Sequence, residues 1–404
     1  MKYWTGYLTA AIIGAITWAL TRLGAKFTTL VDMVYPYVTR TLQDMLARWS
    51  SGVDFCLWQM LALAAVVILI ASIVLMIILR WNPIRWFGWV LAACSMVFLL
   101  HTMVYGLNYY AGPLAEDIRL EVADSYTLDE LTSAAAYYRD QANGLAEQME
   151  RDANGDPKFD SFGALAEQAE NGFHNLVYRD TCPVFAGSTL PVKELGWADL
   201  YSSMGITGVT MGLTGEAAVN PQTPAVGLPF TMCHEMAHRM CIATEGDANF
   251  AAFLAGQAND SLQFRYSAYF MAYRYCYSAL RSVNTEEAAG AAARVASGVG
   301  AKMQHDLDQY DAFFAKKRND TATRVADAAN DTYLKASGDK AGVASYGQVA
   351  DLLVAWHIQG VVLPAITEQQ VPFDPYDESQ VDLSGIANAR EPQPTEAPAD
   401  GGVG

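Results

Sequence analysis

The sequence predicts a membrane anchor of α-helices followed by a mostly helical α+β domain that contains a small sheet. Hydrophobic residues make up 52% of the 404 residues, a high fraction for a soluble protein, and they are concentrated in the first quarter. After Pro113 the chain becomes acidic and follows a helical periodicity. Residues 183–220 differ from both regions because they are rich in Gly, Val and Thr, as short strands are.

Three apolar stretches are long enough to cross a bilayer, and we expect residues 1–110 to form a three-helix transmembrane anchor. The first stretch, residues 3–21, carries no charge. Only Lys2 precedes it and no clear small-residue cleavage site follows, which favours an uncleaved anchor over a signal peptide. The other two stretches, 57–79 and 84–105, are joined by a short loop and therefore predict an antiparallel hairpin.

The hairpin loop predicts the orientation of the anchor. It contains Arg80 and Arg85 next to Trp81 and Trp86, a composition typical of the cytoplasmic side. We therefore expect a multi-pass protein of the cell membrane whose domain after residue 105 is extracytoplasmic. Three basic residues in the preceding loop oppose this orientation: Lys26, Arg40 and Arg48.

The loop between the first two apolar stretches has the pattern of an amphipathic helix. Its apolar positions are Val31, Val34, Tyr35, Val38, Leu42, Met45 and Leu46. We expect this helix to lie either on the membrane surface or on the domain that follows.

The domain that follows is expected over residues 111–373. Residues 126–149 predict a long helix capped by Thr127, residues 162–178 predict a second helix, and the sheet would come from 183–220. Further helices are expected at 250–258, 261–280, 286–299, 302–336 and 345–358. From residue 374 the chain is rich in Pro, Asp, Glu and Gly, so 374–404 should be a disordered acidic tail with a passive solubilising role.

The most informative motif is the His-Glu-x-x-His sequence from His234 to His238, in an otherwise apolar stretch. On a helix the two histidines lie one turn apart on one face, so both can bind a single Zn²⁺. Glu235 borders that face and can act on a zinc-bound water without binding the metal itself. The alternative is a helix with two unrelated histidines. Buried His and Glu side chains on such an apolar helix need partners, however, and a metal supplies them.

Glu245 is the predicted third ligand, because Thr244 can cap a new helix that begins there. Asn249 lies one turn further along the same face and can hydrogen-bond a ligand. Asp247 is the second candidate for the third ligand. In the absence of a metal, Glu245 would simply be an acidic residue favoured by the helix dipole in the first turn. The chain must turn sharply between His238 and this second helix.

These residues resemble the gluzincin branch of the zincin metallopeptidases, in which a second motif, E-x-x-A-N, follows H-E-x-x-H. More narrowly, the sequence resembles a family of bacterial membrane proteins of unknown function that have three N-terminal membrane helices and a zincin-like C-terminal domain. The matching segments are 106–110, 205–208, 214–220, 229–238, 247–250, 264–267 and 345–353. Residues 239–241 and 211–214 depart from the usual pattern. The resemblance implies a zincin-like fold, zinc and a metallopeptidase activity, with substrate peptides added to an edge strand of the sheet.

The rest of the composition limits the partners. A net charge of -17 without aromatic-flanked basic clusters argues against nucleic acid, so a lipid bilayer and a protein or peptide substrate are the expected partners. Among the six cysteines, Cys233 and Cys241 would lie two turns apart on one regular helix, too far to bridge, and we assign no disulfide. Cys233 should also point away from the histidine face, which favours packing over metal binding.

The sequence therefore favours a membrane-anchored zinc peptidase that cleaves proteins or peptides of the cell envelope. Zinc would lower the pKa of its bound water toward about 7, and Glu235 would accept the proton as the water attacks a carbonyl. The resemblance assigns oxyanion stabilisation to a Tyr, His or Arg on a later helix, and Arg265 and Tyr266 are the candidates.

Two other functions are weighed against this one. A zincin-fold binding or assembly protein without proteolysis is the alternative, but such a protein would have no need of the base Glu235. Cleavage within the membrane is disfavoured because the motif helix is expected to lie far from the three spans.

Overall fold

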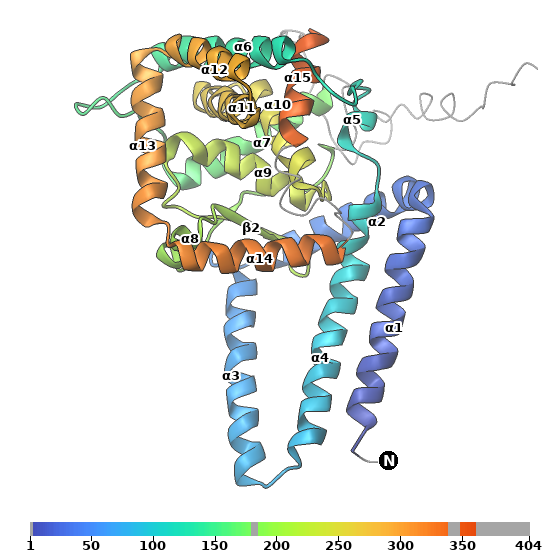
Figure 1. Ribbon diagram of the computed structural model, residues 1–404. Helices are drawn as coiled ribbons and strands as arrows, with labels where there is room; N and C mark the ends of the chain where they lie inside the picture. The colour runs from blue at the N-terminus through green and yellow to red at the C-terminus, as the bar shows by residue number, and fades with distance from the viewer. Residues whose placement is uncertain (1–2, 179–184, 338–347, 361–404) are drawn as a thin grey trace, which may run out of the picture. The chain divides into compact units, whose positions relative to one another are not determined.

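The structure is a computed structural model that describes residues 3–178, 185–337 and 348–360. These residues fall within one compact unit, residues 1–364. They are mostly helical and include a three-stranded sheet (Figure 1). The tail expected at 374–404 and Cys182 lie outside the described residues.

Three helices are long and apolar enough to cross a membrane: α1 (Thr5–Lys26), α3 (Leu57–Ile78) and α4 (Pro83–Val104). They coincide with the three stretches predicted from the sequence, which indicates a membrane protein. In α3 only Gln59 is buried, so its apolar surface is left for lipid to cover. Asn82 caps α4 by accepting a hydrogen bond from the backbone N–H of Arg85, and Pro83 occupies the first turn.

Helix α2 (Thr28–Ser50) lies on the helical domain, by which we mean the described residues from 111 onward. Arg40 Nε donates a hydrogen bond to the carbonyl oxygen of Met240 (3.2 Å), and Gln43 Nε2 donates to that of Gly212 (2.8 Å). The contact uses the polar face of α2, whereas the sequence singled out the apolar face. The apolar side chains that remain exposed include Leu30, Met33, Val34, Tyr37, Val38, Met45 and Trp49. A docked helix with such an exposed face suits a membrane surface.

The sheet comes from residues 183–220, as predicted. Its strands are β1 (Lys193–Glu194), β2 (Gly208–Met211) and β3 (Glu216–Val219), in the order β1-β3-β2. Strand β3 is central, with β1 parallel and β2 antiparallel to it. Among the described residues, β2 therefore pairs on one side only and forms an edge of the sheet.

Glu216 ties this sheet to the start of the membrane helix α3. Its carboxylate accepts hydrogen bonds from the backbone N–H groups of Leu57 (2.7 Å) and Trp58 (2.8 Å) and from Lys193 Nζ (2.8 Å). The first N–H groups of a helix lack partners within the helix and carry partial positive charge, so a buried carboxylate is favourable there. The side-chain amide of Gln59 adds two hydrogen bonds to the backbone of Gly196 (3.1 and 3.0 Å). The sheet and α3 are thus joined by four polar contacts in one place.

The helical domain contains most of the predicted helices. The longer ones are α6 (Leu128–Gln148), α7 (Phe162–Tyr178), α9 (Leu228–Arg239), α10 (Glu245–Ala258), α11 (Leu262–Ser282), α12 (Glu286–Ser297), α13 (Ala301–Lys317), α14 (Asp320–Ser337) and α15 (Gln348–Ile358). The short ones are α5 (Leu114–Asp117), α8 (Ala198–Met204) and η3 (Ala225–Gly227); a further short helix, η1 (Gly106–Tyr110), joins α4 to the domain. Thr127 and Glu130 form a capping box at the start of α6, which confirms the predicted cap.

One predicted helix, 302–336, is in fact two. Arg318 adopts an extended conformation after α13. Asn319 then caps α14, because its side-chain oxygen accepts hydrogen bonds from the backbone N–H groups of Thr321 (3.1 Å) and Ala322 (3.0 Å). The break lets α14 change direction from that of α13 (Figure 1), and its Tyr333 reaches His101 near the end of α4.

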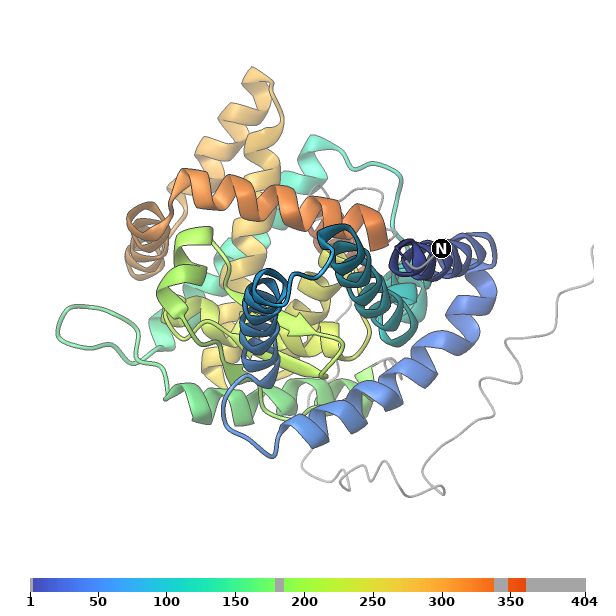
Figure 2. The same cartoon turned by 90° about the horizontal axis from the view of Figure 1, so that it is seen from below.

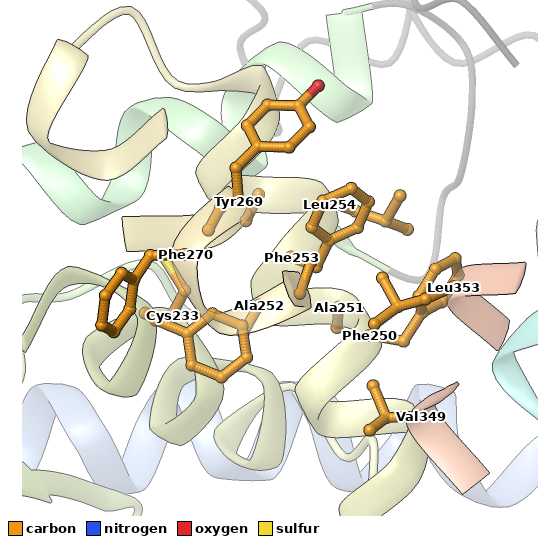
Figure 3. Packing of buried hydrophobic residues seen from close by; sticks show 14 of the residues in the cluster. Cys233, Phe250, Ala251, Ala252, Phe253, Leu254, Tyr269, Phe270, Val349 and Leu353 are labelled. Carbon is orange, nitrogen blue, oxygen red and sulfur yellow. The ribbon is translucent and has the colours of Figure 1, made fainter. Parts of the chain in front are cut away.

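Helix α10 forms the centre of the hydrophobic core. Phe250, Phe253 and Leu254 are at most 1% exposed. Figure 3 shows these side chains packed with Cys233 of α9 and Leu353 of α15. Full burial of a side chain of this size contributes about 1.5–3 kcal/mol. The core therefore holds α9 and α10, the two helices with the predicted metal ligands, in a fixed relation.

We predict that Glu216→Gln destabilises the protein by about 1.5–3 kcal/mol, because the amide loses the charge-assisted bonds to Lys193 and to the start of α3. Thermal unfolding of the purified protein in detergent measures the change. Glu194→Gln, an exposed position on the adjacent strand, is the matched control. Equal melting temperatures for the two variants would show that the Glu216 contacts do not hold α3 to the sheet.

Candidate metal centre

Helix α9 ends at Arg239, and the turn that follows brings the start of α10 next to the histidines of α9. The backbone N–H of Cys241 donates to the carbonyl of His238 (2.9 Å), and that of Ile242 donates to Ala237 (3.1 Å). This is the Schellman pattern, in which the residue after the cap adopts a left-handed conformation; here Cys241 has φ +70°. The sharp turn is confirmed. The regular helix assumed through Cys241 is wrong, because α9 ends at Arg239, and both Cys233 and Cys241 are free thiols.

Thr244 caps α10 as predicted, accepting a hydrogen bond from the backbone N–H of Asp247 (3.3 Å). Its hydroxyl also donates to the Asp247 carboxylate (2.8 Å). Asp247 therefore contributes to the cap, and the alternative in which it is the third ligand finds no support in its position. Glu245, the first residue of α10, lies against the two histidines of α9.

Three side-chain atoms converge at this point. Glu245 Oε2 lies 3.3 Å from His234 Nε2 and 3.6 Å from His238 Nε2. One ligand atom from each residue lies within 4.8 Å of the others. Ligand atoms placed tetrahedrally about 2.0–2.1 Å from one zinc ion are about 3.3 Å apart. The structure thus brings together the three residues predicted as ligands, at spacings that suit a single small cation.

The polar atoms of the cluster are incompletely satisfied without a cation. Glu245 Oε2, the carboxylate oxygen that faces both histidines, is buried and makes no hydrogen bond of good geometry within the described part of the chain. His238 Nδ1 lies 2.9 Å from the carbonyl oxygen of Ile242, so it must donate there, which leaves Nε2 as the free ligand atom. Because an unpaired buried acceptor is costly, these residues fit a bound metal ion.

The charges of the cluster also favour a cation. Burial alone would raise the pKa of Glu245, but the imidazoles of His234 and His238 outweigh it and hold that pKa well below its usual range. Burial opposes the charged form of His238 as well, yet Glu245 and Glu235 raise the pKa of His238 to about 9. Positive charge is therefore stabilised between the two carboxylates.

Glu235 lies beside the cluster and is held by strand β2. Its Oε2 accepts a hydrogen bond from Thr210 Oγ1 (2.7 Å). A Cβ atom at Gly208 would overlap the Glu235 carboxylate, so only glycine lets the strand approach this closely. Burial raises the pKa of Glu235, with the histidines offsetting only part of that effect. A raised pKa makes the carboxylate a stronger base.

Thr210 was not predicted from the sequence. Gly208 belonged to a segment that carried the family resemblance, but no role was assigned to it. The contact of Glu235 with both residues depends on the placement of β2 over α9, which no local pattern encodes.

The cluster lines a cleft of about 1360 Å³. Arg265 and Tyr266 are not among the described residues that line it. Tyr266 is fully buried elsewhere, and its hydroxyl donates to Asp306. The proposal that these two residues stabilise an oxyanion is therefore not supported by their positions.

Tyr275 of α11 does line the cleft. Its hydroxyl donates to Asn249 Oδ1 (3.0 Å). Asn249 therefore positions Tyr275, whereas the sequence predicted that Asn249 would hydrogen-bond one of the metal-binding residues. Four other tyrosines line the same cleft: Tyr105, Tyr109, Tyr310 and Tyr333.

The motif helix is adjacent to the membrane helices, contrary to the expectation that it lies far from them. The hydroxyl of Tyr105, which directly follows α4, donates to the carbonyl oxygen of His238 (3.1 Å). Gly212, just after β2, packs so closely on Tyr105 that a Cβ there would overlap the ring. The cluster therefore lies at the end of a membrane helix.

A family model described as "Protein of unknown function (DUF3810)" matches residues 31–354. The match extends from within α2 to within α15 and includes His234, Glu235, His238 and Glu245. No curated protein and no solved structure matches the chain.

Proposed function

The chain belongs to this family, whose description assigns no function, and we propose that it is a membrane-anchored zinc metallopeptidase. The observation that carries the proposal is the convergence of three ligand atoms next to a buried, oriented carboxylate. His234, His238 and Glu245 would bind zinc and Glu235 would be the general base. Three protein ligands that face a cleft leave a coordination position free, as catalytic zinc sites require.

For the helical domain we infer a zincin-like fold of the gluzincin type. Two features support this inference. The edge strand β2 runs beside the motif helix α9 and lines the cleft, and the second glutamate comes from the start of the next helix, α10. An extended peptide that paired with the free side of β2 would pass the cluster, because Gly208 and Thr210 both contact Glu235.

Bound zinc would supply a water of lowered pKa and an electrophile for the substrate carbonyl. The Glu235 carboxylate would accept a proton from this water and later deliver it to the leaving amine. The hydrogen bond from Thr210 would hold the carboxylate in one orientation during both transfers. Tyr275 is the candidate donor to the developing oxyanion, and to serve there it would turn its single hydroxyl proton from Asn249 Oδ1 to the substrate.

We place the site on the extracytoplasmic side of the cell membrane, where its substrates would be proteins or peptides of the cell envelope. The start of α3 and the end of α4 both contact the helical domain, so the hairpin loop between them lies at the opposite end of the two helices. That loop and the first turn of α4 contain Arg80, Trp81, Arg85 and Trp86, a cytoplasmic composition.

We predict one zinc ion per chain and a base that can be removed without loss of the metal. Elemental analysis should show that the double variant His234→Ala, His238→Ala binds no zinc, whereas His305→Ala, at a histidine paired with Asp156 outside the cluster, retains it.

Glu235→Gln should keep both the bound zinc and the melting temperature of the wild type. It should cleave peptides about a hundred- to ten-thousand-fold more slowly, because an amide cannot accept the proton.

Peptide hydrolysis is followed with a randomised peptide library and mass spectrometry. Undiminished hydrolysis by Glu235→Gln would contradict the proposed mechanism. A zinc-loaded wild type that cleaves no peptide would instead favour a binding or assembly protein.

The orientation is tested by labelling with a membrane-impermeant thiol reagent in intact cells. Ala153→Cys, in an exposed turn of the helical domain, should be labelled without lysis. Trp81→Cys, in the hairpin loop, should be labelled only after lysis. The reverse pattern would place the site and its substrates in the cytoplasm.

A further inference from the structure

The cleft at the metal cluster continues between two membrane helices. The same cavity that is lined by His234 and Glu235 is also lined by Val66 and Leu69 of α3 and by Ala93 and Val97 of α4. These four residues lie well inside helices that are long and apolar enough to cross a bilayer. The cluster is therefore connected to the region occupied by lipid.

The two helices are held apart at the end near the cluster. Close to the hairpin loop they touch, and Trp86 Nε1 donates to Ser72 Oγ (3.2 Å). At the other end, Glu216 ties the start of α3 to the sheet, while Tyr105 ties the end of α4 to the motif helix. The helices therefore diverge toward the cluster (Figure 1), and Figure 2 shows them end-on as separate cylinders.

Helix α14 borders the cavity near the end of α4. Tyr333 of α14 hydrogen-bonds His101 near the end of α4 (3.1 Å) and packs edge-to-face against Tyr109. Both Tyr333 and Asn330 line the cavity. The lining thus changes from aliphatic side chains between the helices to hydroxyl, amide and carboxylate groups near Glu235.

This lining discriminates between classes of occupant. It contains no Lys or Arg among the described residues, so a lipid phosphate would find no cationic side chain next to the cluster. The guanidinium groups of Arg274 and Arg318 line an adjoining hollow, where they face Asp311 and Asp327 (2.9 and 3.9 Å). A neutral polypeptide, by contrast, can pair with the free edge of β2.

We propose that the substrate is a polypeptide with a membrane-embedded apolar segment, which reaches Glu235 from the bilayer through the gap between α3 and α4. This inference rests on the proposed function and adds to it the substrate class and the route of entry. The apolar segment occupies the gap, and the extended residues next to it pair with β2. Backbone that leaves a helix at the membrane must find new hydrogen bonds, and the strand edge provides them.

The test uses the full-length protein in liposomes of neutral phospholipid with two peptide libraries. Both contain the same randomised residues, either free in solution or attached at either end of a single apolar span of about 20 residues. We expect the span-linked library to be cleaved at least about tenfold faster, since the span partitions to the mouth of the gap. A cleavage product is attributed to this protein only if it is absent when the Glu235→Gln variant replaces the wild type.

Two adjacent valines of α3 provide a matched pair of variants that test whether the substrate enters between α3 and α4. Val66 and Val67 are similarly exposed, 52% and 57%, but only Val66 lines the cavity. Val66→Trp should slow cleavage of the span-linked library by about tenfold, because a bulky side chain overpacks the occupied gap, whereas Val67→Trp should leave it unchanged. Val97→Trp, on the opposite wall, repeats the test if Val66→Trp fails to fold.

Each contrary result has a separate meaning. Equal cleavage of both libraries, with no effect of Val66→Trp or Val97→Trp, would overturn the lateral route and leave the peptidase in place. Glu235-dependent release of fatty acid or headgroup from the liposomes would overturn the polypeptide substrate. Failure of the zinc-loaded protein to cleave either library would overturn the proposed function and this inference with it.

Discussion

The candidate metal centre depends on one buried contact, between the carboxylate of Glu245 and the imidazoles of His234 and His238. Taking a charged group out of water costs several kcal/mol, and attraction between opposite charges offsets this only if the geometry is held closely. Here the geometry is held by the core: α10 is buried on nearly all sides, and the Schellman turn after α9 returns the chain to the histidines. The large apolar side chains around α10 therefore stabilise a polar cluster that would otherwise favour unfolding.

The same cluster is connected to the membrane anchor by short polar contacts. Tyr105 after α4 hydrogen-bonds the last turn of α9, and Arg40 of α2 hydrogen-bonds Met240 just beyond it. Arg40 supplies a donor to a carbonyl beyond the end of the helix, and Tyr105 adds a second donor to the His238 carbonyl, which already accepts from the N–H of Cys241. The anchor thus contributes directly to the stability of the motif helix. A displacement of α4 would move Tyr105 and so break or shift its hydrogen bond to the His238 carbonyl.

The features predicted correctly from the sequence are those encoded by neighbouring residues. The spacing of His234 and His238, the Thr244 cap and the three apolar spans each depend on a local pattern. One error is itself local, because Asn319 caps α14 through its next neighbours and so splits a continuous helical periodicity. What the sequence left open depends on distant segments: α2 docks by its polar face because Gln43 and Arg40 find carbonyl partners about 170 and 200 residues away. The roles of Thr210 and Tyr275 depend on the packing of β2 and α11 beside α9 and α10, so their sequence context gave no signal.

The central claim is that His234, His238 and Glu245 together bind one zinc ion. X-ray absorption at the zinc edge of the purified protein tests it most directly. We expect four nitrogen or oxygen neighbours at about 2.0–2.1 Å with the multiple scattering of two imidazoles, and no sulfur at about 2.3 Å. We also expect Glu245→Gln to alter these neighbours. A sulfur shell, or a spectrum unchanged by Glu245→Gln, would show that the metal binds elsewhere and would contradict the account.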